Sequence, residues 1–205
     1  MRTPDAAVTQ VLLVRHGQST WNADGRWQGQ ADPPLSELGI AQAEAAARAV
    51  DGVDAIWASD LERARHTAAI LATPRGLEVV ADVRLREREA GEWTGLTRAE
   101  IDEQYPGALA ERRRPPGFEA DDVLVVRALA ALRDLAAALA GGTGIAVTHG
   151  GVILAVERHH GEDWTPVANL EGRWIEAGAD GSFGLGYRQI LFDPDAVEIT
   201  TPGQP

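Results

Sequence analysis

The chain of 205 residues has a formal net charge of −12, contains no cysteine, and carries 19 basic residues that are all arginine. The absence of cysteine and lysine excludes disulfides, thiolate metal sites and cysteine or lysine nucleophiles, and the acidic balance argues against a nucleic-acid partner. There is no apolar run long enough to cross a membrane, and the polar N-terminus lacks the apolar core of a signal peptide, so we expect a cytoplasmic protein with no membrane partner.

Short apolar runs and segments with helical periodicity alternate along the chain. The first run, Val11–Val14, predicts a buried strand. The expected elements that follow are, in chain order, helix Ser36–Val50 with Ser36 as N-cap, strand Asp54–Ala58, helix Leu61–Ala72, strand Leu77–Ala81, helix Thr97–Gln104 with a capping box, helix Val123–Ala140 ended by glycines, strand Gly144–Thr148, helix Gly151–Arg158, and an antiparallel pair Arg173–Ala177 and Phe183–Ile190. This alternation predicts a single α/β domain over residues 1–205, a three-layer αβα sandwich with a mostly parallel central sheet and one antiparallel strand.

Two segments fall outside this pattern. The stretch Tyr105–Asp122 contains three prolines and two glycines, and long loops in compact domains are often functional. We therefore expect residues 97–122 to form a lid-like insertion, which also carries the dense cationic run Arg112–Arg114. The tail from residue 193 to residue 205 contains prolines and is expected to be flexible.

Polar residues suited to phosphate chemistry follow several of the expected strands. Arg15 and His16 come directly after the first strand, and a cation beside an imidazole favours a phosphate ester as substrate. Three later places add arginine, glutamate and histidine side chains, within Ser59–Ala64, Leu85–Gly95 and Val147–Gly151. Because strand-to-helix turns meet at one edge of a parallel sheet, we expect these groups to converge.

Four strings in this order resemble the histidine phosphatase superfamily, also called phosphoglycerate mutase-like. They are LVRHGQSTWNADGRWQGQADPPLSELGIAQA, SDLERARHTA, LREREAGEWTGLT and VTHGG, and they lie within residues 12–151. The resemblance implies a phosphoglycerate mutase-like fold and a nucleophilic His16 that is phosphorylated during turnover, with no metal ion and no cofactor. It further implies that Glu87 is the proton donor and that the phosphate is bound by Arg15, Asn22, Arg63, His149 and the Gly150 amide.

The physical chemistry of these residues agrees with those roles. Arginine binds a phosphate dianion through a planar, permanently charged fork, and the same cations favour the neutral imidazole that can attack phosphorus. Glu87 is chosen over the nearby Glu89 and Glu92 by its spacing to Gly91 and Gly95. Further contacts with the substrate or lid are expected from Ser19, Trp27, Gln28, Trp93 and Arg113. His159 and His160 are assigned no role.

Three activities are compatible with this set of residues. A phosphomonoesterase acting on a small phosphorylated metabolite is favoured, because the segment from Glu87 to His149 is compact whereas mutases usually carry an insertion there. A cofactor-dependent phosphoglycerate mutase is the alternative within the fold. A phosphate-binding protein without turnover is the third, although binding alone would need neither His16 nor Glu87. The late strands could pair across a homodimer, and the sequence does not decide the oligomeric state.

Overall fold

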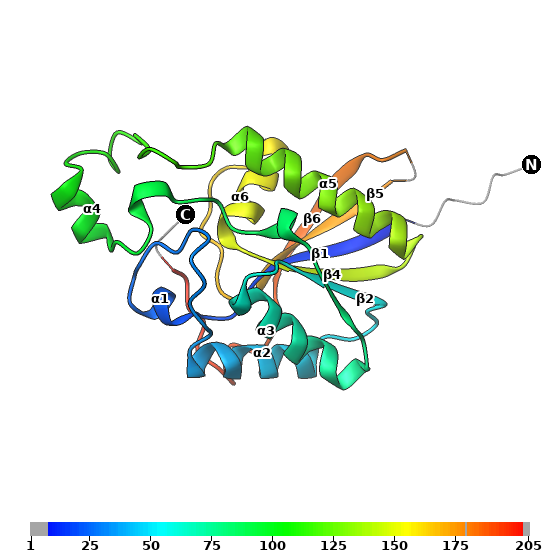
Figure 1. Cartoon of the computed structure of the whole chain (residues 1–205). Coiled ribbons are helices and arrows are strands. Elements are labelled where there is room, and N and C mark those ends of the chain that lie inside the picture. Colours follow the sequence, from blue (N-terminus) through cyan, green and yellow to red (C-terminus); the bar gives the residue numbers. More distant parts are fainter. Residues whose placement is uncertain (1–7, 179, 203–205) are drawn as a thin grey trace, which may run out of the picture.

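A six-stranded sheet forms the centre of the computed structural model, which describes residues 8–178 and 180–202 (Figure 1). The strands lie in the order β3-β2-β4-β1-β5-β6. Their bounds are β1 Thr9–Arg15, β2 Ala55–Ala58, β3 Val79–Ala81, β4 Thr143–Thr148, β5 Glu171–Ala177 and β6 Phe183–Ile190. Only β5 runs against the others, since it pairs antiparallel with both β1 and β6. The predicted sheet, mostly parallel with one antiparallel strand, is therefore confirmed.

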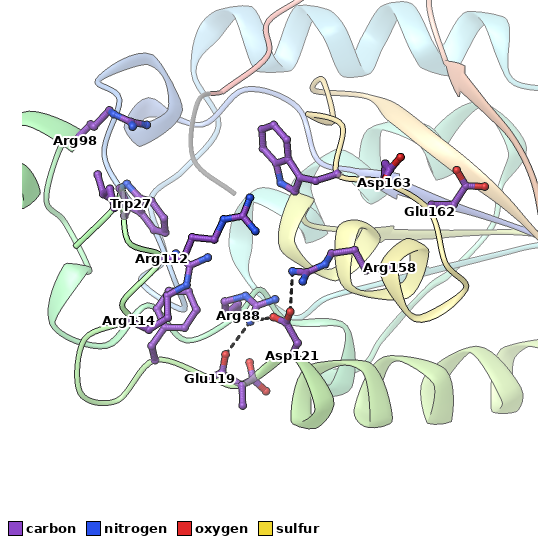
Figure 2. Close-up of a pocket in the computed structure, with 14 residues that line it drawn as sticks. Trp27, Arg88, Arg98, Arg112, Arg114, Glu119, Asp121, Arg158, Glu162 and Asp163 are labelled. Carbon is purple, nitrogen blue, oxygen red and sulfur yellow. Dashed lines mark hydrogen bonds and ion pairs between the residues drawn. The ribbon is translucent and has the colours of Figure 1, made fainter. Parts of the chain in front are cut away.

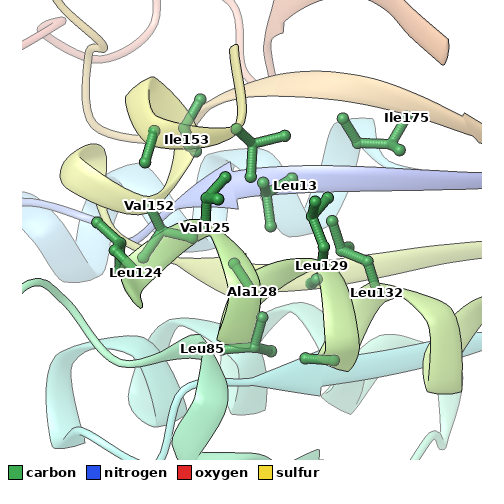
Figure 3. Close-up of a cluster of buried hydrophobic side chains, with 14 of the residues drawn as sticks. Leu13, Leu85, Leu124, Val125, Ala128, Leu129, Leu132, Val152, Ile153 and Ile175 are labelled. Carbon is green, nitrogen blue, oxygen red and sulfur yellow. The ribbon is translucent and has the colours of Figure 1, made fainter. Parts of the chain in front are cut away.

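Helices cover both faces of this sheet and confirm the predicted three layers (Figure 1). Helices α2 (Glu37–Ala49) and α3 (Glu62–Ala72) pack on one face, while α5 (Asp121–Leu139) and α6 (Gly150–His159) pack on the other. The residues of β1 alternate between the two cores, as strand geometry requires. Leu12 and Val14 face the α2 and α3 side, and Leu13 joins the cluster under α5 and α6 that Figure 3 shows.

Helix termini follow the capping signals, with small shifts from the predicted boundaries. Ser36 caps α2 by accepting a hydrogen bond from the Gly39 N–H, and Thr97 with Glu100 forms the expected capping box of α4 (Arg98–Gln104). The short helix α1 (Thr20–Ala23) was not predicted from the sequence. The left-handed residue that ends α5 is Ala140, with φ of 47°, rather than the predicted glycines. Three 3₁₀ turns complete the elements, at η1 Thr73–Arg75, η2 Val83–Leu85 and η3 Gly91–Trp93.

The insertion over residues 97–122 extends beyond the end of the sheet (Figure 1). It has a small core of its own, in which Trp27 and Trp93 pack with Ile101 and Ala108. The aromatic rings of Trp27 and Trp93 meet edge to face with centroids 5.2 Å apart. The insertion is therefore an ordered wall beside the sheet edge, and its action as a lid stays a prediction.

The C-terminal tail is docked over residues 193–202, although the sequence predicts a flexible segment. The Gln42 side-chain amide donates to the Glu198 carbonyl, and the Asn169 N–H donates to the Thr200 carbonyl. Val197 and Ile199 pack against the α2 and α3 core. Residues 203–205 lie outside the described residues. In the described part of the chain, none of the helices combines the length and apolar character that a membrane crossing requires.

Candidate active site

Three segments meet at the carboxyl edge of the central strands. Arg15 ends β1 and His16 follows it, so the polar pair lies directly beyond the buried strand. The His16 backbone N–H donates to the Thr148 carbonyl at the end of β4 (3.0 Å), and the Thr148 hydroxyl donates to the Leu85 carbonyl (2.7 Å). These bonds connect the turns that carry His16, His149 and Glu87, as the sequence predicts.

The His16 imidazole is buried, with 1% of its surface exposed. Its Nδ1 lies 2.6 Å from the Gly17 carbonyl oxygen, which can only accept, so Nδ1 carries the proton. The lone pair is therefore on Nε2, which accepts a hydrogen bond from Arg63 Nε at 3.2 Å. Burial lowers the pKa of His16 well below its usual 6.5, and the Arg63 and Arg15 charges lower it further. These effects favour the neutral form that the sequence predicts, and burial contributes more than the arginines do.

His149 lies against His16, with ring centroids 5.0 Å apart in an edge-on arrangement. It is fully buried, and neither ring nitrogen has a hydrogen-bond partner among the described residues. Burial, and then the charge of Arg63, holds the pKa of His149 well below 6.5. This imidazole is thus neutral at pH 7 and can donate one hydrogen bond to a ligand.

Two buried neutral histidines make folding stability depend on pH. As the pH falls through about 6.5, the unfolded chain takes up protons at His16 and His149, whereas the folded chain does not because both folded-state pKa values are lowered. Stability must therefore decrease with falling pH, by up to about 1.4 kcal/mol per pH unit for each histidine. We expect urea midpoints measured from about pH 7 to about pH 5.5 to show this slope. His149→Gln should remove about half of it, and an unchanged slope in that variant would contradict the interpretation.

The two arginines beside His16 are buried without a neutralising carboxylate. Arg63 donates to the carbonyls of Ala31 (2.7 Å) and Gly29 (3.0 Å), and Arg15 donates to the Val167 carbonyl (2.7 Å). Among the described residues, no carboxylate lies within ion-pair distance of either guanidinium. Burial lowers the pKa of both arginines to about 10, so both stay charged at pH 7. Their positive charge is available to an anionic ligand.

Unsatisfied polar atoms cluster at the same place. Within the described residues, five buried side-chain nitrogens lack a hydrogen-bond partner, and four of them belong to the predicted phosphate-binding residues Arg15, Asn22 and His149. The fifth is Trp93 Nε1 in the insertion core. Buried polar groups in native proteins are nearly always hydrogen-bonded. This concentration of donors therefore indicates a ligand that offers several acceptor oxygens.

Glu87 approaches the first turn of α6. Its Oε2 accepts from the Gly151 N–H (3.1 Å) and its Oε1 accepts from the Arg88 N–H (2.7 Å). A Cβ at Gly151 would lie 2.3 Å from Glu87 Oε1, so glycine is needed there for the carboxylate to approach. Glu87 shares a small cavity with Arg15, whereas Glu92 accepts a hydrogen bond from the Tyr105 hydroxyl at the surface.

The other predicted contacts divide into two groups. Trp27 and Gln28 line the small cavity with Arg15, and Ser19 supports them by donating to Gln28 Oε1 (2.7 Å). Trp93 is buried in the insertion core and lines neither this cavity nor the larger one beside it, which Figure 2 shows. Arg113 lines neither cavity, because its guanidinium pairs with Glu111 (2.6 Å) and donates to the Pro106 carbonyl (3.0 Å).

Gly17 and Gly150 have packing roles. A Cβ at Gly17 would lie 2.5 Å from the Gly39 carbonyl oxygen, so glycine at this position lets α2 pack closely against the segment that follows β1. A Cβ at Gly150 would lie 3.0 Å from Arg15 Nη1, so glycine at this position leaves room for the guanidinium.

No three histidine, aspartate or glutamate side chains are grouped to hold a metal ion in the part of the chain that the structure describes.

Two residues that sequence reasoning missed hold the site in place. Arg127 of α5 donates to the carbonyls of Arg84 (2.7 Å), Arg86 (2.6 Å) and Glu87 (3.0 Å), and so fixes the segment that carries the Glu87 carboxylate. Asn169 donates to the His16 carbonyl (2.9 Å). Both contacts join residues that are far apart in the sequence, and no local pattern marks either of them.

Comparisons with known proteins agree with this geometry. The model of the histidine phosphatase superfamily (branch 1) matches residues 11–169. A metal-independent phosphoserine phosphatase of Arabidopsis thaliana is 39% identical over 163 residues, 74% of this chain and 68% of that protein. A glucosyl-3-phosphoglycerate phosphatase of Mycobacterium tuberculosis is 39% identical over 162 residues, 72% of this chain and 73% of that protein. The solved structure of a mycobacterial glucosyl-3-phosphoglycerate phosphatase with VO3 superposes with a TM-score of 0.79 at 32% identity, covering 87% of this chain and 97% of that one.

Proposed function

The chain belongs to branch 1 of the histidine phosphatase superfamily, and we propose that it is a metal-independent phosphomonoesterase that works through a phosphohistidine at His16. The observation that carries the proposal is the neutral, buried His16 imidazole, whose Nε2 lone pair faces Arg63 among unsatisfied donors. A nucleophile of this kind surrounded by uncompensated cations suits a phosphate dianion. The substrate is a small phosphorylated metabolite, as the names of the two curated relatives indicate for those proteins.

In the first step the Nε2 lone pair of His16 attacks phosphorus and the ester P–O bond breaks. Arg63 Nε transfers its hydrogen bond from Nε2 to a phosphoryl oxygen, which frees the lone pair at the moment of binding. Arg15, Arg63 and His149 then stabilise the charge on the equatorial oxygens. Glu87 in its protonated form gives its proton to the departing alkoxide, so that a neutral alcohol leaves.

In the second step water cleaves the phosphohistidine. The Glu87 carboxylate, held by the N–H groups of Arg88 and Gly151, takes a proton from the attacking water. The new P–O bond forms as the P–N bond breaks, which releases inorganic phosphate. His16 returns to its neutral state, and no metal-bound hydroxide is needed because Glu87 supplies the base.

Phosphatase activity is favoured over the two alternatives. A mutase must protect the phosphohistidine from water so that the phosphoryl group can return to the product. The two curated relatives described above are named as phosphatases, and each is similar to this chain over more than 70% of its length. A binding protein without turnover would gain nothing from a carboxylate held beside the phosphate site by two backbone N–H groups. A cytoplasmic location belongs to the same proposal and is supported only by composition.

The direct test is hydrolysis of p-nitrophenyl phosphate in the presence of EDTA. We expect phosphate release at an undiminished rate, because no step requires a metal ion. Activity that disappears with EDTA and returns with a divalent cation would contradict the proposal. Incubation with 3-phosphoglycerate and 2,3-bisphosphoglycerate separates the mutase alternative, since isomerisation faster than phosphate release would favour it.

A further inference from the structure

The C-terminal tail is hydrogen-bonded to the active site through two buried side-chain amides. Gln42 of α2 and Asn169, two residues before β5, are both 0% exposed, and the half-buried Thr200 of the tail lies between them. Gln42 Nε2 donates to the Thr200 hydroxyl oxygen (3.0 Å), and the hydroxyl donates to Asn169 Oδ1 (2.8 Å). The Asn169 N–H also donates to the Thr200 carbonyl (2.9 Å), so the backbone holds these two residues side by side.

The direction of each amide is fixed by backbone groups that can only donate or only accept. Gln42 Oε1 accepts from the Gln18 N–H (2.9 Å), so Gln42 Nε2 faces the tail. Asn169 Nδ2 donates to the His16 carbonyl (2.9 Å), so Asn169 Oδ1 faces Thr200. The Thr200 hydroxyl accepts from Gln42 on one side and must therefore direct its proton to Asn169 on the other. These hydrogen bonds form a relay with a single direction, from α2 through the tail to the turn after β1.

The relay continues to Asn22, one of the residues predicted to bind phosphate. Asn22 Oδ1 accepts from the Ser19 N–H (3.2 Å) and from Asn169 Nδ2 (3.4 Å). Both bonds end on the oxygen, so Asn22 Nδ2 is buried without a hydrogen-bond partner among the described residues. This nitrogen is the atom that can donate to a phosphate. An amide turned the other way would present its oxygen to the dianion and repel it, so the orientation of Asn22 decides whether it binds or opposes phosphate.

We propose that Thr200 is a positioning residue for the phosphatase reaction. By holding Asn169 Oδ1, it keeps Asn169 Nδ2 on Asn22 and so keeps Asn22 Nδ2 turned toward the phosphoryl group. The inference rests on the proposed function, in which the scissile phosphate lies at His16 and Asn22 is one of its donors. Without the Thr200 hydroxyl, the Asn169 amide can rotate. Its oxygen would then face Asn22 Oδ1, and repulsion between the two oxygens would favour the inverted orientation of Asn22.

Thr200→Val tests the relay because it keeps the shape of the side chain and the backbone hydrogen bond but removes the hydroxyl. We expect the Kd of inorganic phosphate, measured by calorimetry, to rise by about three- to tenfold, and kcat/KM for p-nitrophenyl phosphate to fall by a similar factor. Thr200→Ser restores the hydroxyl and should return both quantities to within about twofold of wild type. Thr201→Val is the matched control, since the neighbouring Thr201 is exposed, and it should change neither quantity.

Asn22→Ala separates an effect through the relay from a general effect on folding. In this background Thr200→Val should cost at most about twofold, because the amide that Thr200 orients is gone. A larger loss there, or wild-type values in Thr200→Val alone, would overturn the inference. Loss of tail docking would lower the urea midpoint and would cost the same factor in both backgrounds. If the wild-type chain hydrolysed no ester, the phosphate affinities of these variants would still decide the inference, and only the reaction proposed for His16 would fail.

Discussion

Replacement of His16 by alanine abolishes turnover, with an expected loss in kcat/KM of at least about 10⁴-fold for every phosphate ester. The loss does not depend on the substrate because the variant lacks the Nε2 atom to which phosphorus would bond. The arginines and His149 remain and still hold phosphate, so inorganic phosphate should bind with little change. Initial rates with p-nitrophenyl phosphate measure the loss, and calorimetry with phosphate measures the retained binding.

Two controls separate loss of the nucleophile from loss of the fold. His16→Asn keeps most of the side-chain volume in a position that is 1% exposed, and it should be as inactive as His16→Ala. His159→Ala, at the end of α6, should retain full activity. Rapid quenching of the wild-type enzyme with labelled substrate should give an acid-labile, base-stable label on His16. A label on another side chain, or substantial turnover by both His16 variants, would show that the chemistry takes a different route.

The layered fold could be predicted because each strand is bounded by local signals. The β1 run is uniformly apolar since both faces of that strand are covered, and its alternate residues enter the two cores. The β5–β6 pair was predicted with the correct bounds for β6. Convergence of His16, Glu87 and His149 followed from topology alone, because the turns after parallel strands lie at one edge.

The residues that sequence reasoning missed act through long-range contacts. Arg127 lies on α5, whose sequence pattern predicts only an apolar helix. In the folded chain it donates to three backbone carbonyls that lie about 40 positions earlier in the sequence. The tail likewise carries loop-forming residues, yet Thr200 is held by Asn169. Neither contact leaves a periodic trace in the sequence.

The arginine triplet shows a different limit. The composition indicates a cationic segment within the insertion, but not which of its side chains line the larger cavity, where the structure has Arg112 and Arg114. Arg112 adopts a left-handed conformation with φ of 55°, and this conformation changes the direction of the chain within the triplet. Arg113 consequently pairs with Glu111 while Arg114 lies over Phe118. Non-glycine residues rarely adopt this backbone conformation, and three consecutive arginines in the sequence do not predict it.

Replacement of Glu87 by glutamine has the second-largest expected effect, and its size depends on the leaving group. For an alkyl phosphate such as glycerol 3-phosphate, the first step needs a proton donor, so kcat should fall by about 10²- to 10⁴-fold. For p-nitrophenyl phosphate the leaving group departs without protonation, so phosphorylation of His16 should remain fast. Hydrolysis of the phosphohistidine still lacks its base. The variant should therefore release a burst of nitrophenol and then turn over slowly, with phosphohistidine accumulating.

Gly151→Ala tests the assignment of Glu87 as proton donor and base by displacing the carboxylate without removing it. The methyl group of Gly151→Ala would lie 2.3 Å from Glu87 Oε1, so the carboxylate must move away from its two backbone donors. This variant should share the burst and the sensitivity to the leaving group that Glu87→Gln shows. Gly184→Ala is the matched control, since a Cβ there would meet only the Glu176 Cβ at 3.9 Å. If Glu87→Gln slowed both esters equally and showed no burst, the proton transfer would have to be assigned to another group, and Gly151 would be important only for packing.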